Sequence, residues 1–215
     1  MRMKQAALAL VLVLAATGCG KNPGAEGFSP TETSLYLTGE GAVIRADVES
    51  YEKDYYDAEE LKATVEEALG AFNGPSGAKA ADGKEAEPSA ILKQCSMENG
   101  TAKLLIQFRD AGEYLRFTDA YPDAESPVQV RGLEIMSVAD GAAKGSLLGE
   151  DFINREGKTV SSGEVVKKSK LTVAAVEGKA LIQTDGEVQF VSPGVVLEGN
   201  WARTPEEGTS YIVFK

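Results

Sequence analysis

The sequence contains no histidine and only two cysteines, Cys19 and Cys95. Without histidine, the chain cannot supply a Ser-His-Asp triad, a histidine general base or a histidine-ligated zinc site. Two cysteines are also too few for a zinc or iron–sulfur site that is built from several thiolates. A large part of enzyme chemistry is thereby excluded, and we expect no cofactor and no metal ligands.

Positive charge is scarce as well. The 215 residues include 22 Lys and Arg against 33 Asp and Glu, so the formal net charge at pH 7 is −11. Such a chain is repelled by phosphate backbones and by anionic lipid headgroups. We therefore expect no nucleic-acid partner, and we do not expect the polypeptide itself to lie on a membrane. The length suffices for one compact domain or two small ones.

One apolar run stands out near the start of the chain. After Arg2 and Lys4, an unbroken series of Ala, Leu and Val extends over residues 6–16. As a helix, this run would measure roughly 17 Å, which is well short of the ~30 Å hydrocarbon core of a bilayer. A basic start, a short apolar core and small residues after it predict a removable export signal, and not a permanent span.

A cysteine follows the small residues directly. The segment Ala16-Thr17-Gly18-Cys19 resembles the lipobox of bacterial membrane lipoproteins, in which Leu is more common at the position of Ala16. The resemblance implies that the Cys19 thiol carries a diacylglyceryl group and that a signal peptidase cuts between Gly18 and Cys19. It also implies a protein that is lipid-anchored on the extracytoplasmic face of the cell membrane. The alternative is an ordinary secretory signal with an incidental Cys19.

Processing at this point would change the chain in two ways. Removal of residues 1–18 takes away Arg2 and Lys4, so the net charge would fall from −11 by two units to −13. With Cys19 acylated, Cys95 would be left alone and no intramolecular disulfide could form. Residues 19–33 are rich in Gly, Pro, Ser and Thr, which predicts a flexible tether.

The remaining patterns predict an α+β fold. We expect antiparallel strands and two amphipathic helices in a ββαββα-like order within a domain at residues 34–138. That domain would include a mobile surface loop at residues 73–89, which is polar and rich in Gly and Ala. Residues 139–215 contain short apolar runs separated by turn pairs, which predicts a β-rich C-terminal part. This part is either a small sandwich or an extension of the first sheet.

Helix starts are marked by acidic caps. Asp57 with Glu60, and Asp110 with Glu113, have the three-residue spacing of a capping box. The first helix then shows apolar residues at intervals of three and four, which indicates one buried stripe. The second helix carries a similar aromatic stripe. These residues are Ala58, Leu61, Val65, Ala68 and Phe72 in the first helix, and Tyr114, Phe117 and Tyr121 in the second.

A hairpin is predicted around Asn99-Gly100, because both residues accept the positive φ angles of a type I′ turn. Pairing outward from this turn places Cys95 opposite Leu104 and Met97 opposite Ala102. Their face would be shared with Ile91, Ile106 and Phe108, which makes Cys95 a small core residue. A further strand is expected over residues 128–136.

Several segments have part of the pattern of a known functional site. Ser50 to Lys53 and Ser76 to Lys79 match S-x-x-K, but the S-D-N and K-T-G partners of that serine chemistry are absent from the sequence.

The tyrosine and acidic residues over 51–60 favour the start of a helix, with a sugar-binding platform as the alternative. Their spacing is not that of an EF-hand loop. Trp201, the single tryptophan, is interpreted as a cap on the β-rich part.

Two hypotheses about function remain open. The chain loosely resembles small uncharacterised lipoproteins of monoderm bacteria, in which the pattern D-Y-Y-D-x-E-E-L (here residues 54–61) is familiar, and this resemblance implies no activity. The first hypothesis is a non-catalytic module that binds an envelope protein or glycan, or assists envelope assembly. The second is a carboxylate-based hydrolase acting on cell-wall or surface glycans, which would need two acidic residues facing each other in a cleft.

Overall fold

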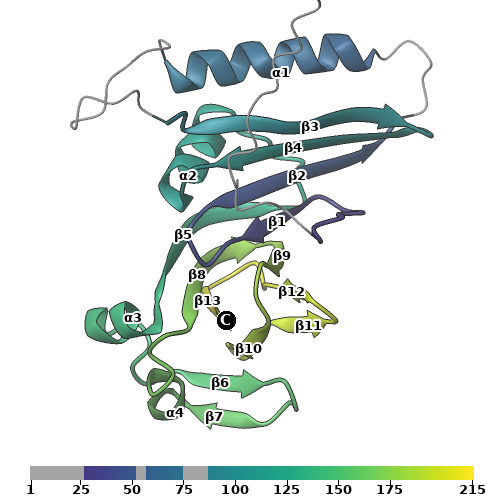
Figure 1. The fold of residues 1–215 in the computed structure, drawn as a ribbon. Helices are drawn as coiled ribbons and strands as arrows, with labels where there is room; N and C mark the ends of the chain where they lie inside the picture. Colours follow the sequence, from purple (N-terminus) through teal and green to yellow (C-terminus); the bar gives the residue numbers. More distant parts are fainter. Residues whose placement is uncertain (1–26, 52–56, 75–86) are drawn as a thin grey trace, which may run out of the picture.

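The computed structural model describes residues 27–51, 57–74 and 87–215, and its strands form two sheets (Figure 1). We call them the large sheet and the small sheet. In the part of the chain that the structure describes, helices and strands combine as an α+β fold whose C-terminal part is rich in strands, which confirms the predicted fold class.

The large sheet combines strands from both ends of the described chain. Its neighbours pair antiparallel, except that β1 and β9 run parallel. In sheet order its strands are β11 (Val196–Glu198), β12 (Trp201–Arg203), β9 (Leu181–Thr184), β1 (Ser34–Leu37), β2 (Val43–Ser50), β4 (Thr101–Phe108) and β3 (Ala90–Glu98).

The small sheet is antiparallel throughout its described ladder. In sheet order its strands are β5 (Gln129–Ser137), β8 (Thr172–Lys179), β13 (Thr209–Phe214), β10 (Val188–Val191), β6 (Asp151–Asn154) and β7 (Thr159–Ser161). Strand β5 comes from the predicted 34–138 segment, whereas β9, β11 and β12 come from residues after 139. Both predicted segments therefore contribute to both sheets.

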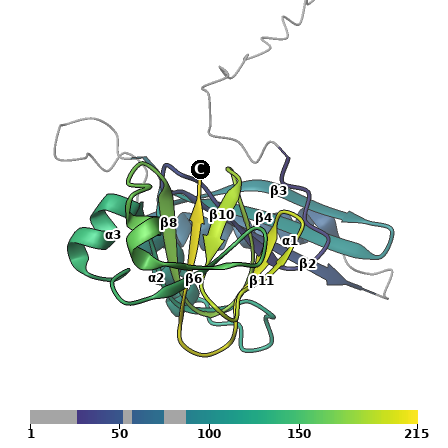
Figure 2. The same cartoon turned by 90° about the horizontal axis from the view of Figure 1, so that it is seen from below.

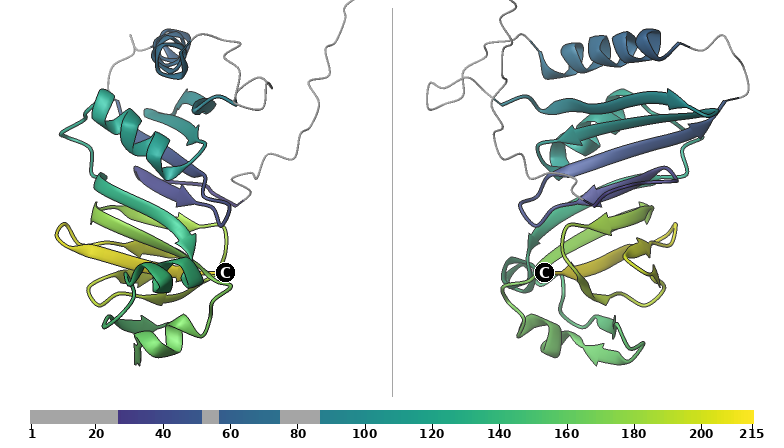
Figure 3. Two further views of the ribbon diagram at one scale, coloured as in Figure 1. Left: turned by 90° about the vertical axis from the view of Figure 1, so that its left-hand side faces the viewer. Right: turned by 45° about the vertical axis from the view of Figure 1, so that its right-hand side comes forward.

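Two helices pack on the inner face of the large sheet, and only the second of them lies next to the small sheet (Figure 3). They are α1 (Ala58–Asn73), which packs along β3, and α2 (Ala111–Ala120), which packs beside β5. Phe72 of α1 meets Phe117 of α2 edge to face, with ring centroids 5.1 Å apart. Burying each such ring contributes about 1.5–3 kcal/mol, so this aromatic contact joins the helices to the core.

The predicted helix caps are present. Asp57 accepts hydrogen bonds from the amides of Glu59 and Glu60, and Asp110 accepts one from the amide of Glu113. Each cap satisfies amides that a helix start leaves without an intrahelical acceptor. The order β1, β2, α1, β3, β4, α2 confirms the predicted ββαββα arrangement.

The predicted hairpin is correct near its turn and wrong further out. Asn99 and Gly100 have φ of 52° and 75°, and Cys95 pairs with Leu104 as expected. A bulge between Leu92 and Gln94 then shifts the register, so Ile91 pairs with Gln107 and leaves the inner face.

Cys95 keeps its predicted face but is only partly buried, so it is not the core residue that we expected. Its sulfur lies 3.9 Å from the Ala58 carbonyl oxygen at the start of α1. Burial raises the pKa of this thiol above its ordinary value.

Two short helices were not predicted from the sequence. They are α3 (Val138–Lys144) and α4 (Ser162–Val166), which cover the face of the small sheet that points away from the large sheet. Val138 and Val165, both fully buried, pack there against Val173 and Val213. Within the described residues, none of the helices has the length and apolar character needed to cross a membrane.

Candidate functional site

Most residues singled out from the sequence fall outside the described residues. These include Gly18 and Cys19, residues 52–56 of the tyrosine-rich acidic segment, and residues 75–86 of the predicted loop. Ser50 ends β2, but the lysine of its S-x-x-K match is not described. Trp201 lies in β12, partly buried against Phe28 with ring centroids 6.0 Å apart.

The structure instead brings acidic side chains together at the end of β2. An open groove of about 480 Å³ lies between the start of β1, the end of β2 and the connection from α2 to β5. We call it the acidic groove. Five of its lining residues carry carboxylates, three carry hydroxyls and two are apolar: Glu32, Asp47, Glu49, Asp123 and Glu125, with Thr31, Thr33 and Ser126, and Val48 and Pro127.

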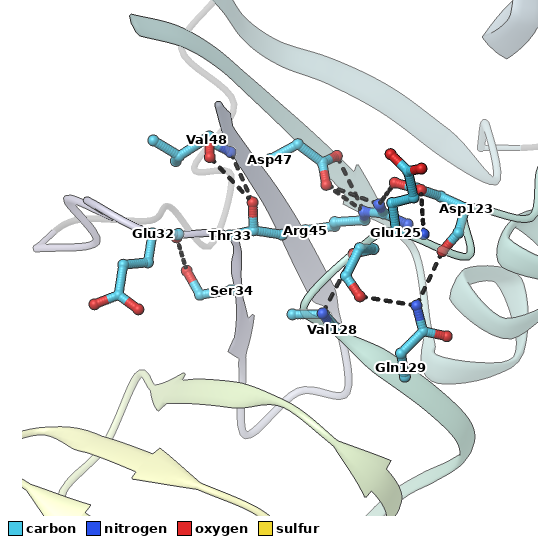
Figure 4. A network of polar contacts seen from close by, with 11 residues as sticks. Glu32, Thr33, Ser34, Arg45, Asp47, Val48, Asp123, Glu125, Val128 and Gln129 are labelled. Atoms are coloured by element: carbon cyan, nitrogen blue, oxygen red, sulfur yellow. Dashed lines mark hydrogen bonds and ion pairs between the residues drawn. The ribbon is translucent and has the colours of Figure 1, made fainter. Parts of the chain in front are cut away.

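Arg45 and Asp47 form the base of this site (Figure 4). They are two residues apart on β2, so both point to the face that also carries Val43 of the core. Arg45 Nε donates to both carboxylate oxygens of Asp47, at 2.8 and 3.0 Å, and its Nη2 lies 2.8 Å from Asp47 Oδ1. The side chains are 9% and 20% exposed, so this ion pair is largely desolvated.

Burial and charge act in opposite directions on the pKa of each member of this pair. Burial raises the pKa of Asp47, and the neighbouring Arg45 guanidinium offsets this only in part. For Arg45, burial alone would lower the pKa, but Asp47, with smaller contributions from Tyr114 and Asp123, raises it above the ordinary value. The nearby hydroxyl of Tyr114 is buried in the core, which raises its pKa to about 12.

The connection between α2 and β5 forms one wall of the groove. Asp123 Oδ2 lies 3.7 Å from Arg45 Nη2, and Asp123 Oδ1 accepts the amide of Glu125. Gln129 Nε2 donates to the carbonyls of Asp123 and Ser126. These bonds hold the connection in one shape, so the Asp123 carboxylate stays over β2.

The opposite wall is continuous with β1. Thr33 Oγ1 donates to the Val48 carbonyl at 3.3 Å and accepts the Val48 amide at 3.0 Å. This side chain therefore extends the β1–β2 pairing beyond the last backbone pair. It places Thr31 and Glu32 at the rim of the groove.

The groove offers negative charge and hydrogen-bond acceptors. In the described part of the chain, no cluster of three or more acidic or cysteine residues has the geometry to hold a metal ion. Both oxygens of Asp47 already accept hydrogen bonds from Arg45. Sequence reasoning did not single out this site. The signal that could have indicated it is the alternation Val43, Arg45, Asp47, which places two charged residues on the core-facing side of a strand. Charged residues in such positions are seldom buried without a partner.

Phe28, near the start of the described chain, packs on the large sheet. Phe28 is 7% exposed, and its ring centroid lies 5.0 Å from that of Tyr36. Tyr36 alternates with Leu35 and Leu37 of the core, so it lies on the outer face of the large sheet. Gln183 Nε2 donates to the Gly27 carbonyl at 3.4 Å. Part of the predicted tether, from Phe28 onward, is thus packed on the sheet.

Comparison with protein-family models, with curated proteins and with solved structures finds no match to this chain.

Proposed function

We propose that this protein is an extracytoplasmic, lipid-anchored lipoprotein that acts as a non-catalytic binding or envelope-assembly module. The observation that carries the anchoring is the order of basic start, short apolar run and Ala16-Thr17-Gly18-Cys19. Two or more acyl chains hold a protein stably on a bilayer, whereas one chain binds reversibly. The acid-rich body is repelled by anionic headgroups, so the lipid on Cys19 supplies the membrane contact.

The acidic groove is the surface that we propose for the partner. Of its five carboxylates, those of Asp47 and Asp123 share the Arg45 guanidinium, and that of Glu32 lies 3.8 Å from Arg203 Nη2. The remaining negative potential attracts a protein that presents Lys or Arg side chains and disfavours anionic polymers. Binding of this kind weakens as the salt concentration rises.

A carboxylate-based glycan hydrolase is the second candidate. The observation in its favour is that burial raises the pKa of Asp47, a property that a general acid needs, in a groove with other carboxylates. Against it, both Asp47 oxygens accept hydrogen bonds from Arg45, which suits a structural ion pair better than a group that must deliver a proton.

The anchor is tested on the native protein and on a Cys19→Ser variant expressed from the full sequence. We expect mass spectrometry to find an N-terminal peptide that begins at acylated Cys19, and we expect the variant to leave the membrane fraction. An unmodified Cys19 thiol, or a mature chain that begins elsewhere, would contradict the proposal.

The groove is tested by charge reversal at exposed rim positions. Glu49→Lys and Glu125→Lys should reduce cross-linking of a partner in intact envelopes, whereas Glu156→Lys, in the exposed turn between β6 and β7, should not. Release of reducing sugar from purified cell walls, lost in Asp47→Asn, would instead favour the hydrolase. Equal cross-linking by all three charge-reversal variants would remove the groove from consideration.

A further inference from the structure

Burial on the inner face of the large sheet falls off along its strands. At one end of β2, β4 and β3, the paired residues Val43, Phe108 and Ala90 are at most 1% exposed. Toward the Asn99-Gly100 turn, two cross-strand rows of this face are only half-buried or exposed: Asp47, Leu104 and Cys95, and then Glu49, Ala102 and Met97. Figure 1 and Figure 2 both show this turn end projecting past the strands of the small sheet.

The same change runs along helix α1, which the structure describes completely. Within its apolar stripe only Leu69 and Phe72 are buried, and both belong to the second half of the helix. Leu61 and Val65, in the first half, are half-exposed. The Cys95 sulfur lies 3.9 Å from the carbonyl oxygen of the first residue of α1. The less buried half of the helix therefore lies against the less buried rows of the sheet.

Helix α2 covers the second half of α1. Phe117 of α2 contacts Phe72, and the hydroxyl of Tyr121 donates to the Ala68 carbonyl at 3.2 Å. The chain then turns toward β2, where Asp123 lies near Arg45. The Tyr121 ring marks this boundary and is itself 39% exposed. The ten residue steps of α1 before Ala68 correspond to about 15 Å of helix.

The less covered surface has the width of one further helix. Helix α1 packs along β3, and β2 lies two strands away in the sheet, which is about 10 Å. Neighbouring helices pack about 8–10 Å apart, so a second helix beside the first half of α1 would lie over β4 and β2. We call this surface the apolar strip, and its residues are Leu61, Val65, Met97, Ala102, Leu104 and Tyr121.

Carboxylates border the apolar strip on both sides. On the β2 side lie Asp47, Glu49 and Asp123 of the acidic groove. On the other side, acidic residues outnumber basic ones along α1, which carries Glu59, Glu60, Glu66 and Glu67 against Lys62. An apolar surface between two acidic borders is complementary to a helix whose apolar stripe lies between two rows of Lys or Arg.

We propose that the apolar strip and the acidic groove together bind a basic amphipathic helix of the partner protein. The apolar stripe of that helix packs beside α1, and its Lys and Arg side chains reach the carboxylates of Asp47, Glu49 and Asp123. The inference rests on the proposed binding role of the groove and goes beyond it, because attraction between charges requires neither a helix nor an apolar face. Apolar contacts are not screened by salt, so part of the affinity persists at high ionic strength.

The test uses two synthetic, dye-labelled peptides of about eighteen residues with identical composition. The striped peptide has Leu at intervals of three and four with Lys on both sides, and the scrambled peptide has the same residues without a stripe. The protein is the full chain carrying Cys19→Ser, so that no acyl chain binds the peptides. Fluorescence anisotropy should show about tenfold tighter binding of the striped peptide. This difference should remain when NaCl is raised from about 0.1 M to about 0.5 M.

Two substitutions test the apolar strip from separate elements. Leu61→Gln in α1 and Met97→Gln in β3, both at half-exposed positions, should each weaken the striped peptide about tenfold and leave the scrambled peptide unchanged. Ala63→Gln, at an exposed position on the opposite side of α1, is the matched control and should change neither. Urea unfolding verifies that the three variants are equally folded.

The inference and the proposed function fail in different ways. Equal binding of the two peptides, weakened in both cases by Glu49→Lys, would overturn the amphipathic helix and leave the acidic groove as a site for charge alone. Tighter binding of the striped peptide that survives both Leu61→Gln and Met97→Gln would exclude the apolar strip as its site. Binding that Glu49→Lys does not weaken would remove the groove and the inference together. A dimer in sedimentation that Leu61→Gln dissociates would show that a second copy covers the strip, which also overturns the inference.

Discussion

Replacing Arg45 by methionine is the sharpest test of how the acidic groove is built. The substitution keeps an unbranched apolar stem and most of the volume of the side chain but leaves the Asp47 carboxylate, which is 20% exposed, without its cation. Removing one partner of a buried ion pair costs about 3–5 kcal/mol. Because water still reaches part of Asp47, we expect the lower end of this range, about 3 kcal/mol.

Equilibrium unfolding in urea measures this loss in a chain that lacks residues 1–19. Arg45→Met should lower the midpoint without changing the dependence of the free energy of unfolding on urea concentration. The double variant Arg45→Met/Asp47→Leu should return to within about 1 kcal/mol of the wild type, because both charges are then removed together. Asp123→Asn is the matched control, since the Asp123 side chain is 43% exposed and such contacts contribute about 0–1 kcal/mol.

The same variant has a pH dependence with a definite sign. Burial raises the pKa of Asp47 in the folded protein, and loss of Arg45 removes the main influence that lowers it. A carboxyl whose folded pKa is raised binds its proton more tightly when folded, so its favourable contribution is present below the unfolded pKa of about 3.9 and is lost as pH rises through the folded value. Arg45→Met should therefore differ least from the wild type near pH 4 and most at pH 7.

Two results would refute this reasoning. One is a loss below about 1 kcal/mol for Arg45→Met at pH 7, which would mean that the pair is effectively solvated. The other is a double variant as unstable as the single one, which would mean that Arg45 acts through packing and not through its charge.

Three further predictions concern the rest of the fold. Gly186→Ala should destabilise the fold by several kcal/mol or prevent folding, because an added Cβ would overlap the Lys215 carbonyl oxygen. Gly70→Ala in α1 should instead stabilise by about 1 kcal/mol, because nothing lies within 4 Å of the added atom. Thermal unfolding compares the two variants. Asp57→Ala should lower the free energy of unfolding by about 1 kcal/mol, because two amides at the start of α1 lose their acceptor. Unfolding in urea measures this loss, and a variant as stable as the wild type would contradict the assigned cap. The Cys95 thiol should react with iodoacetamide at pH 7 more slowly than glutathione does, because burial raises the pKa of Cys95. A rate equal to that of glutathione would show that α1 does not shield this thiol from solvent.

Local signals in the sequence predicted the elements that local bonds create. The Asp57 and Asp110 caps act over three residues, and the Asn99-Gly100 turn needs only the φ angles of its own two residues. Each of these was predicted correctly, because its free energy is contained within one short segment. The bulge beyond Leu92 was not predicted, since it depends on how the whole strand meets β4.

The sequence by itself determined the absence of histidine, the acidic net charge and the order of helices and strands in residues 34–121. It also supplied the segment Ala16-Thr17-Gly18-Cys19, on whose resemblance to a lipobox the proposed anchor depends. Only the tertiary structure decided that β5 joins the small sheet, that β9 returns beside β1, and that Asp123 lies over Arg45. The reason is that composition and local turns are properties of neighbouring residues. Strand exchange and the acidic groove depend instead on pairing and packing between segments far apart in the chain, which no local pattern encodes.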